Sequence, residues 1–214
     1  MKYVLKISCL FLVAAVLTGF SVTDEKAEQI LKSSKAKIES LKDFSAKVKY
    51  EVSSPTMRNS FVKEGSFKYK QGNKFVVALS DEEYYCDGKT LWHYIPADAE
   101  VFEQEFDPEE GGSLEAIFDV YQANTEARYV GMESVHKVPC HKIFLVVKDP
   151  SLEYNQAYIW VNTKTKLLEK VVQIDRKQTK TTYEFSGIRA NTGLSDTDFR
   201  FNPKAHPGVQ IYRD

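Results

Sequence analysis

The pattern of apolar and polar positions changes its period early in the chain, from a helical one to a strand-like one. Residues 24–42 carry an apolar stripe at helical spacing, in which Ser34 fills one place: Ala27, Ile30, Leu31, Ile38 and Leu41. The stripe predicts an amphipathic helix that packs along another element. From Phe44 onward, apolar and polar residues alternate with period two, which is typical of half-buried strands.

Strand-like alternation continues to residue 106 and resumes, after a break, from residue 129 to residue 188. Turn residues separate the runs, and Asp87-Gly88 between residues 83–86 and 91–94 is the strongest hairpin signal. A two-residue turn of this kind requires positive φ at both central residues. We therefore expect an α+β chain that is mainly β: a single curved antiparallel sheet of about ten or eleven strands with two or three helices.

The strand after this turn has no plainly polar face, because Leu91, Trp92, His93 and Tyr94 follow one another. A strand that is apolar on both faces must be covered on both faces. We expect protein to cover one of them and either protein or a ligand to cover the other. The sequence leaves open which of the two faces points inward.

A second helix is predicted in the middle of the chain, after the polar segment 107–112 with its Gly111-Gly112 pair. Ser113 can cap it, and four apolar residues follow at helical spacing: Leu114, Ile117, Phe118 and Tyr121. Two interpretations remain open. The helix either fills the core, or it is a lid over a cavity that exchanges its apolar contacts for a ligand.

The first 22 residues have the composition of a secretory signal peptide, with Lys2 and Lys6 before an apolar run from Ile7 to Val22. An uncleaved membrane anchor is the alternative. Cys9 lies at the start of the apolar run without a small-residue box before it, so we expect no lipid anchor. Residues 23–214 then form one domain. The formal net charge of −1 becomes −3 without the two lysines, and no basic run suggests nucleic-acid binding.

The sequence contains no catalytic motif, so we predict neither an enzyme nor a bound cofactor or metal. His93, His136, His141 and His206 lack metal-ligand spacing. Cys86 and Cys140 remain after cleavage of the leader, and either a disulfide or two small buried side chains fits them. The aromatic content of 13% suits either a packed β core or a deep apolar pocket for an acyl chain.

Three segments carry a resemblance to a known family: EGSFKYKQGNKF at 64–75, DGKTLWHYIP at 87–96 and FRFNPKAHPGVQI at 199–211. The chain resembles the periplasmic outer-membrane lipoprotein carrier proteins, the LolA-like family. The ending looks most like the variant found outside the proteobacterial type. The resemblance implies an unclosed half-barrel capped by the N-terminal helix and the mid-chain lid helix, with an apolar cavity for acyl chains.

The resemblance also implies a ligand-binding site formed by the inward residues of the sheet and by the lid: Phe67, Tyr69, Phe75, Val77, Leu79, Leu91, Trp92, Leu114, Ile117, Phe118 and Tyr121. One position departs from the family. Proteobacterial members carry an arginine that ties the lid shut where this chain has Gln71. A neutral glutamine lacks the charged fork of arginine, so lid closure would rest on Lys70 or on packing alone.

The resemblance implies a monomeric periplasmic carrier that shuttles lipoproteins from the inner to the outer membrane. Its implied partners are acylated lipoproteins, an inner-membrane ABC-type lipoprotein releasing complex and an outer-membrane acceptor. Binding of free lipid is the alternative, as is a lipid-sensing regulator with the same half-barrel, which would need a second domain. A periplasmic enzyme would need a polar cluster in the cavity, and the sequence shows none.

Overall fold

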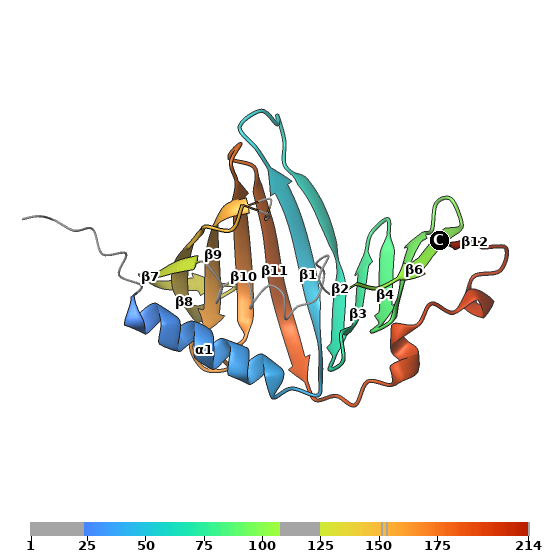
Figure 1. Cartoon of the computed structure of the whole chain (residues 1–214), viewed down its shortest axis with the longest axis horizontal. Coiled ribbons are helices and arrows are strands. Elements are labelled where there is room, and N and C mark those ends of the chain that lie inside the picture. Colours follow the sequence, from blue (N-terminus) through green and yellow to red (C-terminus); the bar gives the residue numbers. More distant parts are fainter. Residues whose placement is uncertain (1–23, 108–124, 151, 153, 214) are drawn as a thin grey trace, which may run out of the picture.

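A broad, curved sheet with a helix lying across one face dominates the structure, a computed structural model that describes residues 24–107, 125–150, 152 and 154–213 (Figure 1). The predicted signal peptide at 1–22 and the predicted lid residues between 113 and 121 lie outside the described residues, so both stay predictions. Among the described helices, none has the length and apolar character that a membrane span requires.

Within the described part of the chain, the sheet has twelve strands: β1 (Asp43–Ser53), β2 (Phe61–Lys70), β3 (Lys74–Leu79), β4 (Glu83–Asp87), β5 (Thr90–Ile95), β6 (Glu100–Glu105), β7 (Thr125–Val135), β8 (Val138–Val147), β9 (Tyr154–Asn162), β10 (Leu168–Asp175), β11 (Lys180–Ala190) and β12 (Gln210–Arg213). Their spatial order is β12-β6-β5-β4-β3-β2-β1-β11-β10-β9-β8-β7. Every neighbouring pair is antiparallel except β12 and β6, which run parallel.

β12 and β7 stand at the two ends of this order and do not pair with each other, so the sheet that the described strands form is not closed into a barrel. The predicted fold class, a mainly β chain with an open half-barrel sheet, is confirmed. The strand number is higher than expected because β12 lies in what the sequence presents as a tail. Its partner β6 is more than a hundred residues away in the chain, and no local pattern reveals such a pairing.

Helix α1 (Glu25–Glu39) confirms the helix predicted over 24–42, and its N-cap residue, Asp24, anchors its start. The Asp24 carboxylate accepts hydrogen bonds from the backbone N–H of Lys26 at 2.9 Å and of Tyr129 at 3.0 Å. The first bond caps the helix and the second ties it to β7. Its buried face is the predicted stripe, Ala27, Leu31, Ser34 and Ile38. We call the face of the sheet that α1 covers the inner face.

The hairpin at Asp87-Gly88 is present, but its turn differs from the expected one. Cys86 and Leu91 are the last register partners before the turn, and of the residues between them only Gly88 has positive φ, at 90°. The Asp87 carboxylate accepts hydrogen bonds from the N–H of Lys89 and of Thr90, so the Asp87 side chain stabilises the turn. The expectation of positive φ at both central residues is therefore wrong.

The C-terminal segment covers the outer face of β4, β5 and β6 through two short 3-10 helices, η2 (Asp196–Phe199) and η3 (Pro203–Ala205), and the residues around them. Phe201 packs on Tyr94 with 5.1 Å between ring centroids. Trp92 belongs to this outer cluster, whereas Leu91 packs against the cluster on the inner face. The face left open by the sequence is thus settled, with Leu91 and His93 pointing inward.

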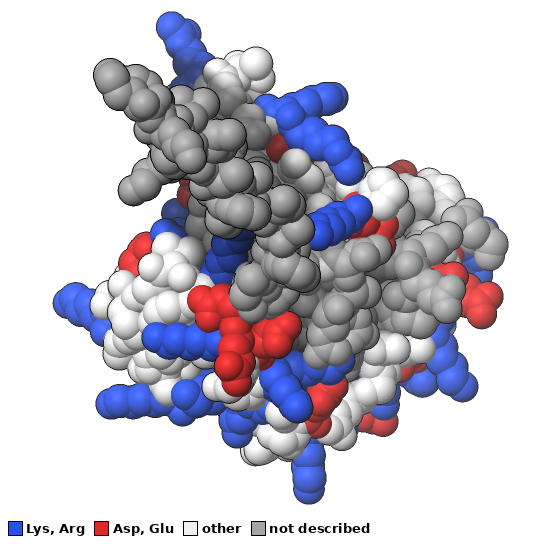
Figure 2. Space-filling model, turned by 60° about the vertical axis from the view of Figure 1, so that its left-hand side comes forward, with Lys and Arg blue, Asp and Glu red and all other residues white. Residues whose placement is uncertain are grey.

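Charged side chains are mixed over the side of the molecule that Figure 2 brings forward. Lysine and arginine side chains stand among aspartate and glutamate side chains there, and the basic ones are not gathered in one place.

Candidate functional site

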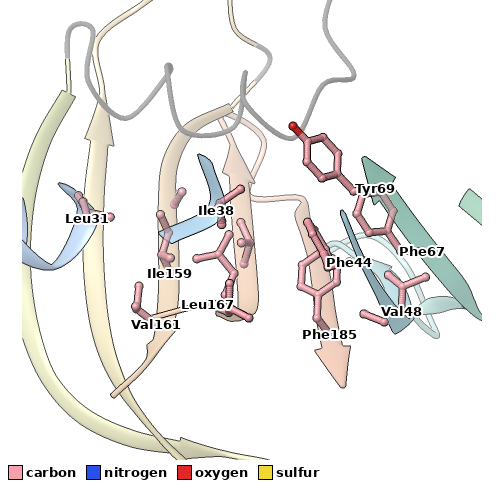
Figure 3. Packing of buried hydrophobic residues seen from close by; sticks show 14 of the residues in the cluster. Leu31, Ile38, Phe44, Val48, Phe67, Tyr69, Ile159, Val161, Leu167 and Phe185 are labelled. Atoms are coloured by element: carbon pink, nitrogen blue, oxygen red, sulfur yellow. The ribbon is translucent and has the colours of Figure 1, made fainter. Parts of the chain in front are cut away.

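The inner face of the sheet carries one continuous apolar cluster that reaches from α1 across most of the strands. Figure 3 shows Phe44, Phe67 and Phe185 facing one another, with Ile38 of α1 beside Leu167. The ring centroids of Phe44 and Phe67 are 5.6 Å apart, and those of Phe67 and Phe185 are 6.1 Å apart. Such distances are typical of favourable aromatic pairs.

Six of the predicted site residues lie together in this cluster. Phe67, Tyr69 and Phe75 are buried in it, while three half-buried residues pack against it: Val77, Leu79 and Leu91. Strand register brings them together, because Phe67 pairs with Val77 and Tyr69 pairs with Phe75. Alternation along β2 and β3 was therefore a sufficient signal for five of these positions, whereas it could not assign Leu91 to a face.

The remaining predicted site residues lie elsewhere. Trp92 is on the outer face, where its Nε1 donates a hydrogen bond to Glu103 Oε2 at 2.9 Å. Four predicted lid residues fall outside the described residues: Leu114, Ile117, Phe118 and Tyr121. Sequence reasoning did not include Phe44, Phe106 or Phe185, although alternation marked Phe44 as an apolar strand position.

Between α1 and the sheet lies a small apolar cavity of about 20 Å³, lined by Ile38, Phe44, Leu167, Leu168, Phe185 and Ile188. That volume is comparable to the space one water molecule needs, so it is far too small for an acyl chain. A ligand that enters at this point must displace contacts between α1 and the sheet.

The turn between β2 and β3, where the family arginine would stand, is tied to other elements. Gln71 Nε2 donates a hydrogen bond to the carbonyl oxygen of Glu39 at 2.9 Å, at the end of α1. Lys70 Nζ donates to the Leu194 carbonyl at 2.8 Å and pairs with Asp196 at 2.6 Å. Among the described residues, Gln71 therefore holds α1 and Lys70 holds the C-terminal segment.

Asp196 is paired a second time, with Lys74 Nζ at 2.7 Å. Hydrogen bonds from Lys70 and Lys74 lower the pKa of Asp196 to about 2. The carboxylate thus stays ionised and joins the β2–β3 turn to η2 at neutral pH.

A polar cluster centred on Glu82 borders the inner face. Glu82 Oε2 accepts a hydrogen bond from Tyr84 Oη at 2.7 Å and lies 3.0 Å from His93 Nε2, while Lys63 Nζ is 2.5 Å from Oε1. Burial opposes ionisation of Glu82, but hydrogen bonds from Lys63, Tyr84 and His93 outweigh it and lower the pKa of this carboxyl. An ionised carboxylate only accepts, so His93 Nε2 carries a hydrogen.

The two cysteines of the described residues are free and buried in different clusters. Cys86 packs in the inner cluster and Cys140 in an outer one with Trp160. Burial raises the pKa of each thiol to about 11, so both are inert small residues at neutral pH. The sequence left open a disulfide or two small buried side chains, and the structure supports two separate buried side chains. The described residues contain no group of three or more His, Cys, Asp and Glu placed to hold a metal ion.

The fold of this protein is similar to that of several proteins of known structure. The structure is similar to that of an uncharacterized conserved protein from Thermus thermophilus, with TM-score 0.58 and 11% identity over 89% of this chain and 100% of that chain. It is also similar to LprF from Mycobacterium bovis, with TM-score 0.52 and 13% identity over 85% of this chain and 98% of that chain. At such identities the likeness shows the fold alone.

At the sequence level, no curated protein gives a significant match to this chain. The family model described as outer membrane lipoprotein carrier protein LolA, however, matches residues 39–202, which is more than half of the sequence. That range runs from the end of α1 to the C-terminal segment on the outer face and so includes eleven of the twelve strands. The protein therefore belongs to the LolA family of outer membrane lipoprotein carriers.

Proposed function

We propose that this protein is a periplasmic carrier that binds the acyl chains of lipoproteins against its inner face and shuttles them from the inner to the outer membrane. The observation that carries the proposal is the continuous apolar inner face of a sheet that stays open at both edges. A helix covers this face in part, and helix–sheet contacts can be exchanged for contacts with a ligand.

The energetics of acyl chains explain why such a carrier needs a face of this kind. Removing an acyl chain from water releases about 0.8 kcal/mol per CH₂, or roughly 12 kcal/mol for a chain of ~16 carbons. A carrier must offer comparable apolar contact, and it must also let the chain leave. Rings on adjacent strands, such as Phe67 and Phe75, provide a large apolar surface that needs no hydrogen bonds.

The finer parts of the proposal follow from the family and the sequence. Residues 1–22 direct export and residues 23–214 form the carrier domain. Acyl chains contact the six inner residues of the predicted site, and the lid prediction for residues 114–121 is kept. The partners are acylated lipoproteins, an inner-membrane ABC-type releasing complex and an outer-membrane acceptor, and the protein acts as a carrier and not as an enzyme.

The test uses spheroplasts that synthesise a labelled lipoprotein and hold it in their inner membrane. Purified protein is added, and the soluble one-to-one complex in the supernatant is measured. We expect release of the acylated lipoprotein and no complex with a matched variant that lacks the acylated cysteine.

A carrier with Phe67→Asp, which places a charge in the apolar cluster, should release little cargo, whereas Val130→Asp on the exposed part of edge strand β7 should release as much as the unmodified protein. Absence of release by folded protein with an active releasing complex would contradict lipoprotein transfer. Binding of free lipid, or lipid sensing, would then be the function to test.

A further inference from the structure

Four rings form a continuous ladder on the inner face, from the apolar cluster to the edge of the sheet. Tyr84, His93, Phe102 and Tyr212 are direct register partners across β4, β5, β6 and β12. Tyr84 and His93 are stacked with centroids 4.2 Å apart, His93 and Phe102 are 6.3 Å apart, and Phe102 and Tyr212 are stacked at 5.3 Å. We call these four residues the ring ladder.

One end of the ring ladder packs against the apolar cluster, and the other end is exposed to solvent. Tyr84 pairs with Val77 and, like it, packs against the main apolar cluster. At the other end the exposed fraction is 41% for Phe102 and 45% for Tyr212. Large apolar side chains exposed side by side are costly in water and often mark a binding surface.

Carboxylates hold three of the four rings, Tyr84, His93 and Tyr212, by their polar atoms. Glu82 bonds both Tyr84 Oη and His93, as described above, and Tyr212 Oη donates a hydrogen bond to Glu100 Oε1 at 3.1 Å. Burial and the Glu82 hydrogen bond raise the pKa of Tyr84, so its hydroxyl keeps its proton. These three rings are thus oriented before any ligand arrives, and Phe102 lies between two of them, which lowers the entropy cost of binding.

The exposed part of the ladder is only one side chain wide. Neighbours two residues along a strand share its face. Glu100 and Gln104 therefore flank Phe102 on β6, and Gln210 borders Tyr212 on β12. A broad protein surface or a bilayer needs a wide apolar patch, whereas a single extended aliphatic chain fits a narrow strip. With about 4.8 Å between strands, the ladder is roughly 14 Å long.

From this geometry we propose that the ring ladder binds an acyl chain of the cargo as a subsite that extends the main cluster to the edge of the sheet. The inference rests on the proposed function and adds a second, solvent-facing contact region to it. The occupant is an acyl chain because the strip is continuous with the face that the carrier proposal assigns to acyl chains.

The test compares two double variants of the purified protein in binding a fluorescent peptide that carries one palmitoyl chain, with the same peptide without that chain as a blank. Phe102→Ser with Tyr212→Ser removes the exposed half of the ladder. Val130→Ser with Met132→Ser is the matched control, because these residues are 53% and 57% exposed on the opposite edge strand. Loss of the contacts of about two methylene groups corresponds to roughly tenfold weaker binding for the ladder variant. The control should stay within about twofold of the unmodified protein.

A second measurement locates the chain directly. Phe102→Trp places a fluorophore in the ladder, and a peptide with a brominated palmitoyl chain should quench it with the same concentration dependence as binding. Val130→Trp should not be quenched.

If the peptide binds but the ladder variant keeps full affinity and Trp at 102 is not quenched, the ladder is overturned and the carrier proposal stands. If the unmodified protein does not bind the palmitoyl peptide at all, both proposals fail. If the ladder variant binds normally but no longer delivers cargo to membranes, the ladder is a docking surface and the acyl subsite is wrong.

Discussion

Single side chains fasten the C-terminal segment to the sheet, and Asp196 is the centre of one such fastening. It pairs with Lys70 and Lys74 on either side of the β2–β3 turn. The segment that follows carries Phe199 and Phe201, which are buried against the outer face. The ion pairs therefore attach the start of this C-terminal segment to the β2–β3 turn.

This fastening should depend on pH in the acid range. The pKa of Asp196 falls from 3.8 to about 2 on folding, so its stabilising contribution is complete above pH 3.8 and is lost as pH falls toward 2. We expect Asp196→Asn to lower the unfolding midpoint at pH 6, with the difference from the unmodified protein shrinking between pH 4 and pH 2. Denaturant unfolding at several pH values measures this. A difference that is unchanged at pH 2 would contradict it.

How much the sequence predicts at residue scale depends on what covers a strand. Phe67, Tyr69 and Phe75 could be assigned to the inner face because polar residues alternate with them. Residues 91–94 could not be assigned, since both faces are covered and both are apolar. The outer cover comes from Phe201 and its neighbours, a hundred residues later in the chain. No local pattern carries that information, and Trp92 was placed in the candidate site for this reason.

At the scale of elements, the β2–β3 and β4–β5 turns meet, and their contact requires glycine at position 88. A Cβ on Gly88 would lie 2.3 Å from the carbonyl oxygen of Gly72, and Gly88 also has a φ of +90°. The β4–β5 turn therefore packs directly on the β2–β3 turn, the one that holds α1 through Gln71. The sequence predicted both turns, but it could not predict their contact because that depends on the curvature of the sheet.

Gly88→Ala should consequently destabilise the protein by about 3 kcal/mol or more, from backbone strain together with the clash. Gly72→Ala is a matched control, because this glycine has φ +87° but no neighbouring atom within 4 Å of the point where a Cβ would lie. It should cost about 1 kcal/mol, from strain alone. Urea unfolding measures both free energies. Equal losses for the two variants would show that the turns do not press on each other.

For the whole molecule, an open sheet has two exposed edges that a closed barrel lacks. β12 is only four residues long, and its last residue, Arg213, donates a hydrogen bond from Nε to Glu103 Oε1 of β6 at 2.9 Å. Short, charged edges limit pairing with other chains. The open architecture, the inner cluster and the family are consistent with one account, in which the inner face exchanges protein contacts for an acyl chain. Alternation anticipated a single curved antiparallel sheet, whereas its open form was expected only from the family resemblance, and the family match supports the function.

Photo-crosslinking tests the central claim most directly. A peptide with a photoreactive group near the end of its palmitoyl chain is bound, irradiated and located by mass spectrometry after digestion. We predict labelling of peptides that contain Phe67, Phe75 or Leu91, and competition by unlabelled palmitoyl peptide. Labelling confined to the outer face around Trp92 and Phe201, or labelling that does not saturate, would contradict the assignment of the inner face as the acyl-binding site.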